Sequence, residues 1–183
     1  MIKIHEDVKK VLLTEEEIAK RVKELGAEIS KDYEGKEIVM VCLLTGAAWF
    51  ATDLSRALEN DMRMDFMVAS SYGNGTTTSG NVKVSLDVRT DLSNKHVLLV
   101  DDIIDTGTTF KAITDMLASR NVASIKTCAL CDKKERRTAD INADYVGFVI
   151  PDEFVVGYGL DFAGSYRNLP YIGVLKSSVY AKV

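Results

Sequence analysis

The sequence predicts an α/β protein whose mostly parallel sheet is flanked by helices. Two observations predict this class: apolar runs rich in β-branched residues, which are typical of strands buried on both faces, and segments of helical apolar spacing that alternate with them. The 183 residues are 46% hydrophobic and 27% charged, which is typical of a folded chain. We see no linker or internal repeat and expect one domain over residues 1–183.

The first elements follow from capping and apolar patterns. Thr14 and Glu17 have the form of a capping box, and apolar residues then recur at helical spacing from Ile18 to Ile29, which predicts an amphipathic helix. Residues 37–44 form a continuous apolar run, which predicts a buried strand. A helical segment around Trp49 follows.

Two further strands are predicted on either side of residues 70–81. Apolar and polar residues alternate in 64–68 and again in 82–86. The segment between them is rich in Gly, Ser and Thr, has Tyr72 as its apolar anchor, and is expected to be mobile. One interpretation is a long hairpin loop, and the other is a lid that orders over a ligand.

The second half of the chain is expected to be rich in strands. Residues 97–100 predict a buried strand, and Ile113 and Leu117 predict the apolar face of the helix that follows it. Further strands are predicted within 122–131, 145–150 and 171–175.

Charge and cysteine content exclude several classes of function. With 23 Lys and Arg against 27 Asp and Glu, the net charge of −4 argues against a broad nucleic-acid or membrane-binding face. No apolar stretch approaches the about 18 residues of a membrane span, and the charged N-terminus does not resemble a signal peptide, so a cytoplasmic protein is expected. Cys42, Cys128 and Cys131 are expected to be reduced and buried, because a zinc site lacks further ligands.

The segment from Asp101 to Thr109 joins a predicted strand to a predicted helix and carries most of the chemistry. In open α/β sheets, ligands bind beyond the carboxyl ends of the strands. A helix N-terminus with the hydroxyls of Thr106, Thr108 and Thr109, and with Gly107 permitting close approach, suits a phosphate monoester. Neither a P-loop nor a dinucleotide fingerprint is present.

Asp101 and Asp102 precede this phosphate cradle, where bare carboxylates would repel an anion. Ribose hydroxyls or a Mg²⁺ ion between the carboxylates and the phosphate would remove the conflict, since Mg²⁺ commonly uses one or two protein carboxylates. The string therefore predicts a site for a phosphorylated ribose. Taken singly, the acids have an ordinary explanation: Asp101 and Asp102 would end a strand and Asp105 would cap a helix.

Residues 97–109, VLLVDDIIDTGTT, resemble the 5-phosphoribosyl-1-pyrophosphate (PRPP) signature of the type I phosphoribosyltransferases. Ser71-Tyr72, Asp132-Lys133 and residues 146–161, VGFVIPDEFVVGYGLD, are similar to the hypoxanthine(-guanine) phosphoribosyltransferases. The resemblance covers nearly the whole chain in the family's order. It implies the type I phosphoribosyltransferase fold, with a small hood formed by the terminal segments and a flexible lid loop that includes Ser71 and Tyr72.

The resemblance also implies an activity: transfer of the phosphoribosyl group of PRPP to N9 of hypoxanthine or guanine, giving IMP or GMP and pyrophosphate. It implies that Asp101 and Asp102 bind the ribose hydroxyls near a Mg²⁺ ion, and that residues 105–109 hold the 5-phosphate. Asp105 is implied to accept a proton at N7. Because an unperturbed Asp has a pKa of about 3.9, a role as electrostatic stabiliser stays open.

The purine-binding residues are implied in the same way. Lys133 matches the lysine that donates to the purine O6, Phe154 the ring that stacks on the base, and Val155 the main-chain groups at the base edge. Without the resemblance, Lys133 would be a solvated turn residue and Phe154 part of a short core strand.

On the pyrophosphate side, Asp161 matches an acid near a second Mg²⁺ ion, and Arg167 matches an arginine that contacts pyrophosphate. Leu44-Thr45-Gly46 matches the pyrophosphate loop, in which the family has a cis peptide before the glycine. Many members carry Lys or Arg in place of Thr45, so weaker pyrophosphate affinity is expected here.

Two other functions stay open, and so does the assembly. A xanthine- or guanine-preferring relative would share the PRPP loop, whereas an RNA-binding regulator on the same fold would need a basic face that a net charge of −4 does not favour. Family members are usually homodimers or homotetramers, which is implied here too. Trp49 and Phe50 could serve such an interface, although core packing is the expected use of both.

Overall fold

The computed structural model describes residues 3–71 and 82–181. Its helices and strands are β1 (Val8–Leu13), α1 (Glu15–Asp32), β2 (Ile38–Leu44), α2 (Ala48–Ala57), β3 (Met62–Ser71), β4 (Val82–Leu86), β5 (His96–Ile104), α3 (Thr108–Ala118), β6 (Ser124–Asp132), the 3₁₀ turn η1 (Lys134–Arg136), β7 (Tyr145–Val149), β8 (Val155–Val156), β9 (Ile172–Leu175) and α4 (Ser177–Tyr180).

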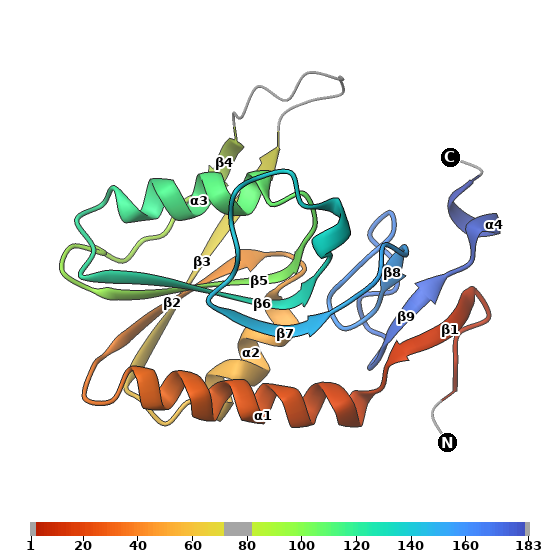
Figure 1. Cartoon of the computed structure of the whole chain (residues 1–183), viewed down its shortest axis with the longest axis horizontal. Coiled ribbons are helices and arrows are strands. Elements are labelled where there is room, and N and C mark those ends of the chain that lie inside the picture. The colour runs from red at the N-terminus through yellow and green to blue at the C-terminus, as the bar shows by residue number, and fades with distance from the viewer. Residues whose placement is uncertain (1–2, 72–81, 182–183) are drawn as a thin grey trace.

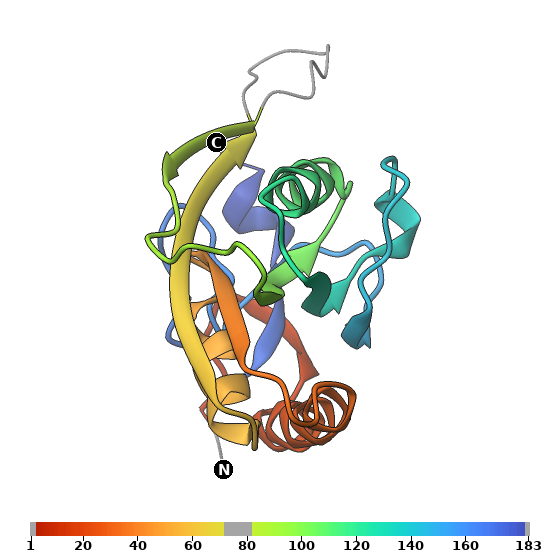
Figure 2. The same ribbon diagram turned by 90° about the vertical axis from the view of Figure 1, so that its left-hand side faces the viewer.

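The central sheet has the strand order β4-β3-β2-β5-β6-β7. All neighbouring strands are parallel except β4, which runs antiparallel to β3 at the edge. Helices α1 and α2 lie on one face of this sheet and α3 on the other (Figure 1), and the sheet is strongly twisted when it is viewed along its edge (Figure 2). The predicted α/β fold with a mostly parallel sheet is confirmed.

Strand β2 is apolar throughout because both of its faces are covered. Met40 and Cys42 belong to the core between the sheet and helices α1 and α2. Val39 and Val41 belong to the core between the sheet and α3. Since successive side chains of a strand point to opposite faces, two cores require an unbroken apolar run.

The first helix begins as its sequence predicts. Thr14 Oγ1 accepts the Glu17 N–H over 3.2 Å, and the Glu17 carboxylate accepts the Thr14 N–H over 2.8 Å, which completes the capping box. Helix α2, the helical segment expected around Trp49, spans Ala48–Ala57. Phe50 is fully buried, whereas Trp49 is 37% exposed, so the core packing expected for Trp49 is wrong.

A second, smaller sheet with the order β1-β9-β8 forms a hood beside the carboxyl ends of the central strands (Figure 1). Strand β1 pairs antiparallel with β9, so that residues near the two ends of the chain lie side by side. The implied hood of terminal segments is therefore confirmed. No helix within residues 3–71 and 82–181 is long and apolar enough to cross a membrane.

Strand β5 extends past the predicted strand 97–100. The acids at the end of the predicted strand 97–100 lie within β5 itself, because pairing with β6 continues to Ile104 opposite Asp132.

The predicted lid lies largely outside the described residues: Ser71 ends β3, while Tyr72 is not described.

The cysteines are free and buried, as expected. Burial raises the pKa of the Cys42 thiol to about 12 and raises the pKa values of Cys128 and Cys131 as well.

Candidate active site

Strand β5 carries Asp101 and Asp102 near its carboxyl end. The Asp102 N–H donates to Asp101 Oδ1 over 2.9 Å. Burial, followed by the neighbouring Asp102 carboxyl, raises the pKa of Asp101 well above its ordinary range. Burial also raises the pKa of Asp102, although a hydrogen bond from Asp101 and the charge of Arg167 oppose this effect. These adjacent carboxyls suit a cation or hydroxyl donors, because the protein does not fully compensate their charge.

The loop after β2 lies against Asp102. A Cβ atom built on Gly46 would come within 1.6 Å of Asp102 Oδ2, so glycine permits this approach. The Leu44–Thr45 peptide is cis, one bond ahead of the Thr45–Gly46 bond. The expected cis peptide is therefore present in this loop, but it lies between Leu44 and Thr45 and not directly before Gly46.

The loop after β5 turns into helix α3 at Gly107. Gly107 is the N-cap with a φ of +83°, a left-handed conformation that favours glycine. Helix α3 begins at Thr108 and has no acidic residue in its first turn. The N-cap Gly107 supplies no side-chain hydrogen bond, and the Thr108 N–H makes only a long one of 3.5 Å to Thr106 Oγ1. This helix N-terminus therefore suits an anion, which the sequence predicts at residues 105–109.

The Asp105 carboxylate lies beside Arg136. Arg136 Nε is 3.2 Å from Asp105 Oδ1, and Arg136 Nη1 is 3.9 Å from Asp152 Oδ1. Asp105 Oδ1 is nevertheless buried without a well-aligned hydrogen-bond donor among the described residues. The Asp105 side chain as a whole is 40% exposed, so its carboxylate is still accessible as an acceptor for a ligand.

Lys133 follows β6 directly and is buried, with a side chain that is 8% exposed. Its Nζ atom lies 3.8 Å from Asp152 Oδ1, and its backbone N–H donates to the Ile104 carbonyl over 2.9 Å. A solvated turn residue, the ordinary alternative for Lys133, is excluded. A buried ammonium at this edge is a hydrogen-bond donor for a polar ligand group.

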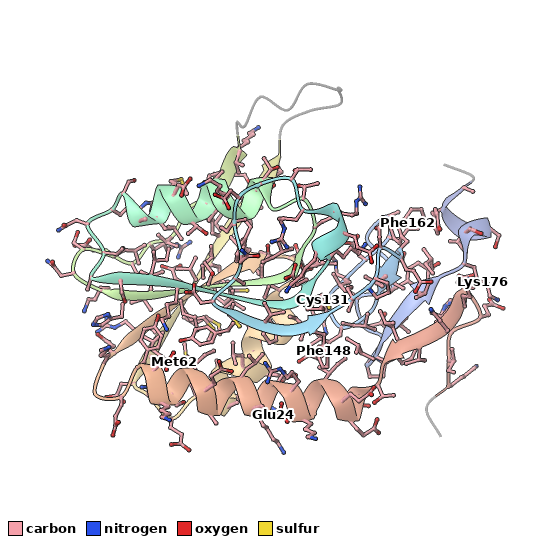
Figure 3. All side chains as sticks on the ribbon, viewed as in Figure 1. Glu24, Met62, Cys131, Phe148, Phe162 and Lys176 are labelled. Atoms are coloured by element: carbon pink, nitrogen blue, oxygen red, sulfur yellow. The ribbon has the colours of Figure 1, made fainter. Side chains whose placement is uncertain are left out.

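Phe154 stands on the hood side of the site. Its ring stacks on Tyr180 of α4 at 5.0 Å between centroids and meets Phe162 edge-on at 5.6 Å. Phe154 remains 39% exposed, whereas Val155 is buried in β8. Figure 3 labels Phe162 near the hood and Cys131 near the carboxyl end of β6. The structure thus presents an accessible aromatic ring rather than a core strand residue at position 154.

Arg167 and Asp161 meet beside the loop that carries Gly46. Arg167 Nη2 lies 2.8 Å from Asp161 Oδ1, and Arg167 Nη1 donates to the Gly159 carbonyl over 2.5 Å. A Cβ atom on Gly159 would come within 2.0 Å of the Gly46 carbonyl oxygen. Residues far apart in the chain therefore lie side by side in this part of the site.

Comparisons with known proteins identify the family. The model of the phosphoribosyl transferase domain matches residues 10–163. The hypoxanthine-guanine phosphoribosyltransferase of Staphylococcus aureus is 52% identical over 97% of this chain and 99% of its own length. The chain belongs to the phosphoribosyltransferase family. It resembles the hypoxanthine(-guanine) group of that family.

Solved structures agree with this assignment of the phosphoribosyltransferase. A crystal structure of the hypoxanthine phosphoribosyltransferase of S. aureus has a TM-score of 0.94 and 53% identity, over 96% of each chain. The hypoxanthine phosphoribosyl transferase of Trypanosoma cruzi has a TM-score of 0.94 and 42% identity, over 98% of this chain and 97% of that chain.

In this phosphoribosyltransferase, most of the site residues expected from the sequence lie at one edge of the sheet or on the hood beside it. Within the described residues, however, no three His, Cys, Asp or Glu side chains gather closely enough to hold a metal ion by themselves. Asp101 and Asp102 adjoin each other, while Asp161 is engaged by Arg167 and by the Gly164 N–H at 2.7 Å.

Sequence reasoning missed the arginines of the loop after β6. Arg136 contacts the Asp105 carboxylate, and Arg137 pairs with buried Asp132. The only signal for them was the run of charged residues 132–137, within which composition does not distinguish a site residue from a solvated one.

Proposed function

We propose that the protein is a purine salvage enzyme that transfers the 5-phosphoribosyl group of PRPP to N9 of hypoxanthine and guanine. The observation that carries the proposal is the buried Lys133, because an ammonium there can donate to a purine O6 but meets an amino group in adenine. The name of the S. aureus relative, hypoxanthine-guanine phosphoribosyltransferase, supports the same reaction. The products are IMP and GMP together with pyrophosphate.

Residues 105–109 are proposed to hold the 5-phosphate, and Asp101 and Asp102 the ribose hydroxyls. The N–H groups at the start of α3 favour an anion, whereas the carboxylates favour hydroxyl donors. The phosphate is therefore proposed to lie at the loop before α3, and the ribose hydroxyls at the carboxyl end of β5.

Mg²⁺ is the proposed cofactor. The donor set fits: Asp101 and Asp102 are adjacent half-buried carboxyls, and Mg²⁺ is held through one or two carboxylates with substrate oxygens and water. When bound, Mg²⁺ supplies positive charge that stabilises the leaving pyrophosphate. Asp161 is proposed to lie near a second Mg²⁺ on the pyrophosphate side.

The purine is proposed to lie between Lys133 and Phe154. Lys133 donates to O6, the Phe154 ring stacks on the base, and Val155 offers its main-chain groups to the base edge. The partial exposure of the Asp105 side chain supports its role at N7, where the carboxylate accepts the proton that the purine loses as N9 bonds to the ribose.

Leu44, Thr45, Gly46 and Arg167 are proposed to bind pyrophosphate. As the bond from C1 of the ribose to pyrophosphate breaks and the bond to N9 forms, positive charge develops on the sugar. The carboxylates of Asp101, Asp102 and Asp105 are suited to stabilise this charge, while Arg167 holds the departing anion.

The test is an assay of the purified protein with PRPP, Mg²⁺ and one of hypoxanthine, guanine, xanthine or adenine. Formation of IMP and GMP, with adenine poorly used, is the expected result. Preference for xanthine indicates a relative of different base choice. Absence of any nucleotide product overturns the proposal and favours a non-catalytic regulator, such as an RNA-binding protein.

We further propose that residues 1–183 act as one domain in the cytoplasm, as a homodimer or homotetramer without a nucleic-acid or membrane partner. Size-exclusion chromatography with light scattering tests the assembly, and a monomer at micromolar concentration would contradict it.

A further inference from the structure

Arg137 has no role in the proposed reaction, yet its side chain is only 12% exposed. Its guanidinium donates from all three nitrogens: Nη2 to the Asp132 carboxylate, Nη1 to the Ile141 carbonyl over 2.5 Å and Nε to the Asp105 carbonyl over 3.2 Å. The Asp132 side chain is 2% exposed, so this ion pair is buried. Arg137 therefore joins the end of β6 to the loop that begins helix α3.

The segment after Arg137 holds the same loop. The N–H groups of Thr138 and Ala139 both donate to the Thr106 carbonyl over 3.0 Å. A Cβ atom on Gly107 would come within 2.8 Å of Arg137 Cδ, so the arginine stem packs directly against the glycine.

These contacts fix the direction of backbone donors. In a trans peptide the C=O group and the following N–H group point in opposite directions, and these peptides are trans. Because the Asp105 and Thr106 carbonyls point toward residues 137–139, the N–H groups of Thr106 and Gly107 point away from them. Neither N–H group has a hydrogen-bond partner among the described residues.

We infer that Arg137 is a positioning residue that orients the phosphate-binding N–H groups of Thr106 and Gly107. The inference rests on the proposed function and extends it. Through Asp132, the same side chain also holds the segment that carries Lys133. Arg137 therefore contacts both the loop proposed to bind phosphate and the segment proposed to bind the purine.

Arg137→Lys is the test, because lysine keeps the charge beside Asp132 but cannot donate to three separate acceptors in the arginine geometry. Calorimetric titration with ribose 5-phosphate is expected to give an affinity about tenfold weaker, the equivalent of one hydrogen bond. The KM for PRPP should rise in parallel, while kcat and the KM for hypoxanthine change less. Lys134→Gln, in the exposed part of the same turn, is the control and should match the parent.

A second variant separates positioning from folding. Removing one partner of a buried ion pair leaves an uncompensated charge and can unfold the protein, whereas Asp132→Asn with Arg137→Gln removes both charges together. This double variant is expected to melt closer to the parent than Arg137→Gln alone and still to bind ribose 5-phosphate weakly. Affinity within twofold of the parent in folded Arg137→Lys or in the double variant would overturn the inference. A parent that binds ribose 5-phosphate but makes no IMP would overturn the proposed function alone.

Discussion

Buried charge concentrates at the end of β6. Asp132 and Lys133 are buried neighbours there, and Arg137 compensates the first while Asp152 approaches the second. The sequence alone could not select Lys133 from the basic residues of the same run, and the family resemblance selected it. Burial of Asp132 was not predicted. Its partner Arg137 lies beyond a 3₁₀ turn, and the composition of the segment does not encode the geometry of that turn.

Lys133→Gln tests the proposed hydrogen bond from Lys133 to the purine O6. The variant retains a polar side chain but loses the ammonium, so kcat/KM for hypoxanthine is expected to fall about a hundredfold, since a charge-assisted hydrogen bond is lost from a buried site. Discrimination against adenine should narrow. Steady-state kinetics with both bases measure the change, with exposed Lys134→Gln as the matched control. Unchanged kcat/KM for hypoxanthine would contradict the assignment.

Thr45→Lys tests the departure of this chain from many family members. A lysine here adds positive charge to the loop that contacts Asp102, and the affinity for pyrophosphate is expected to rise about tenfold. Calorimetry with magnesium pyrophosphate measures it. Thr52→Lys, which adds the same charge on helix α2, is the control. Equal pyrophosphate affinity in the two variants would contradict the expectation that a basic residue at position 45 strengthens pyrophosphate binding.

At the scale of elements, most strands of the sheets were predictable from their apolar residues, including the short strands β4, β7 and β9, whereas β1 was not. The strand predicted at 37–44 is observed as β2. A strand that is covered on both faces needs a continuous apolar run, and such a run is easily recognised in the sequence. Strand β1 was not predicted: Lys9 and Lys10 interrupt its apolar residues, and its pairing with β9 shifts register beside them. The end of β5 was misplaced because pairing with β6 continues past the last purely apolar residue.

Asp87→Asn tests an ion pair between elements. Arg120, after α3, donates to both Asp87 oxygens over 2.8 and 2.9 Å, and this contact holds the pKa of Asp87 below its ordinary 3.8. A carboxyl with a lowered folded-state pKa stabilises the protein above its unfolded-state pKa, and this stability is lost as pH falls through the folded-state pKa.

We therefore expect Asp87→Asn to lower the free energy of unfolding at about pH 7 by less than about 1 kcal/mol, because both groups are partly exposed. The difference should shrink as pH falls toward about 3. Urea denaturation at several pH values measures it. Asp115→Asn, which removes an exposed pair within α3, should cost less. A difference that grows on acidification would be inconsistent with the pKa shift.

At the scale of the molecule, the proposed site is built from both sheets. The central sheet supplies Asp101, Asp102 and the loop proposed to hold the phosphate, and the hood side supplies Phe154 and Arg167. Patterning predicted the central sheet, whereas the hood came from the resemblance. The close approach of Gly159 to Gly46 joins segments too distant in sequence for any local pattern to connect.

Tyr180→Ala tests the support that the hood gives to Phe154. Removing the stacked ring frees one face of Phe154, and the KM for hypoxanthine is expected to rise threefold to tenfold, or about 0.5–1.5 kcal/mol for an aromatic pair. The KM for PRPP should change little. Ser178→Ala, an exposed change in the same short helix, is the control. An unaltered KM for hypoxanthine would show that Phe154 needs no such support.

The burial of Cys42, Cys128 and Cys131 has a practical consequence. Buried thiols with raised pKa values carry little thiolate at neutral pH and react slowly with maleimides. A fluorophore could therefore be attached to one new surface cysteine, such as Lys134→Cys beside the site, while all native sulfur atoms stay in place. Substrate binding could then be followed by fluorescence without first replacing the three native cysteines.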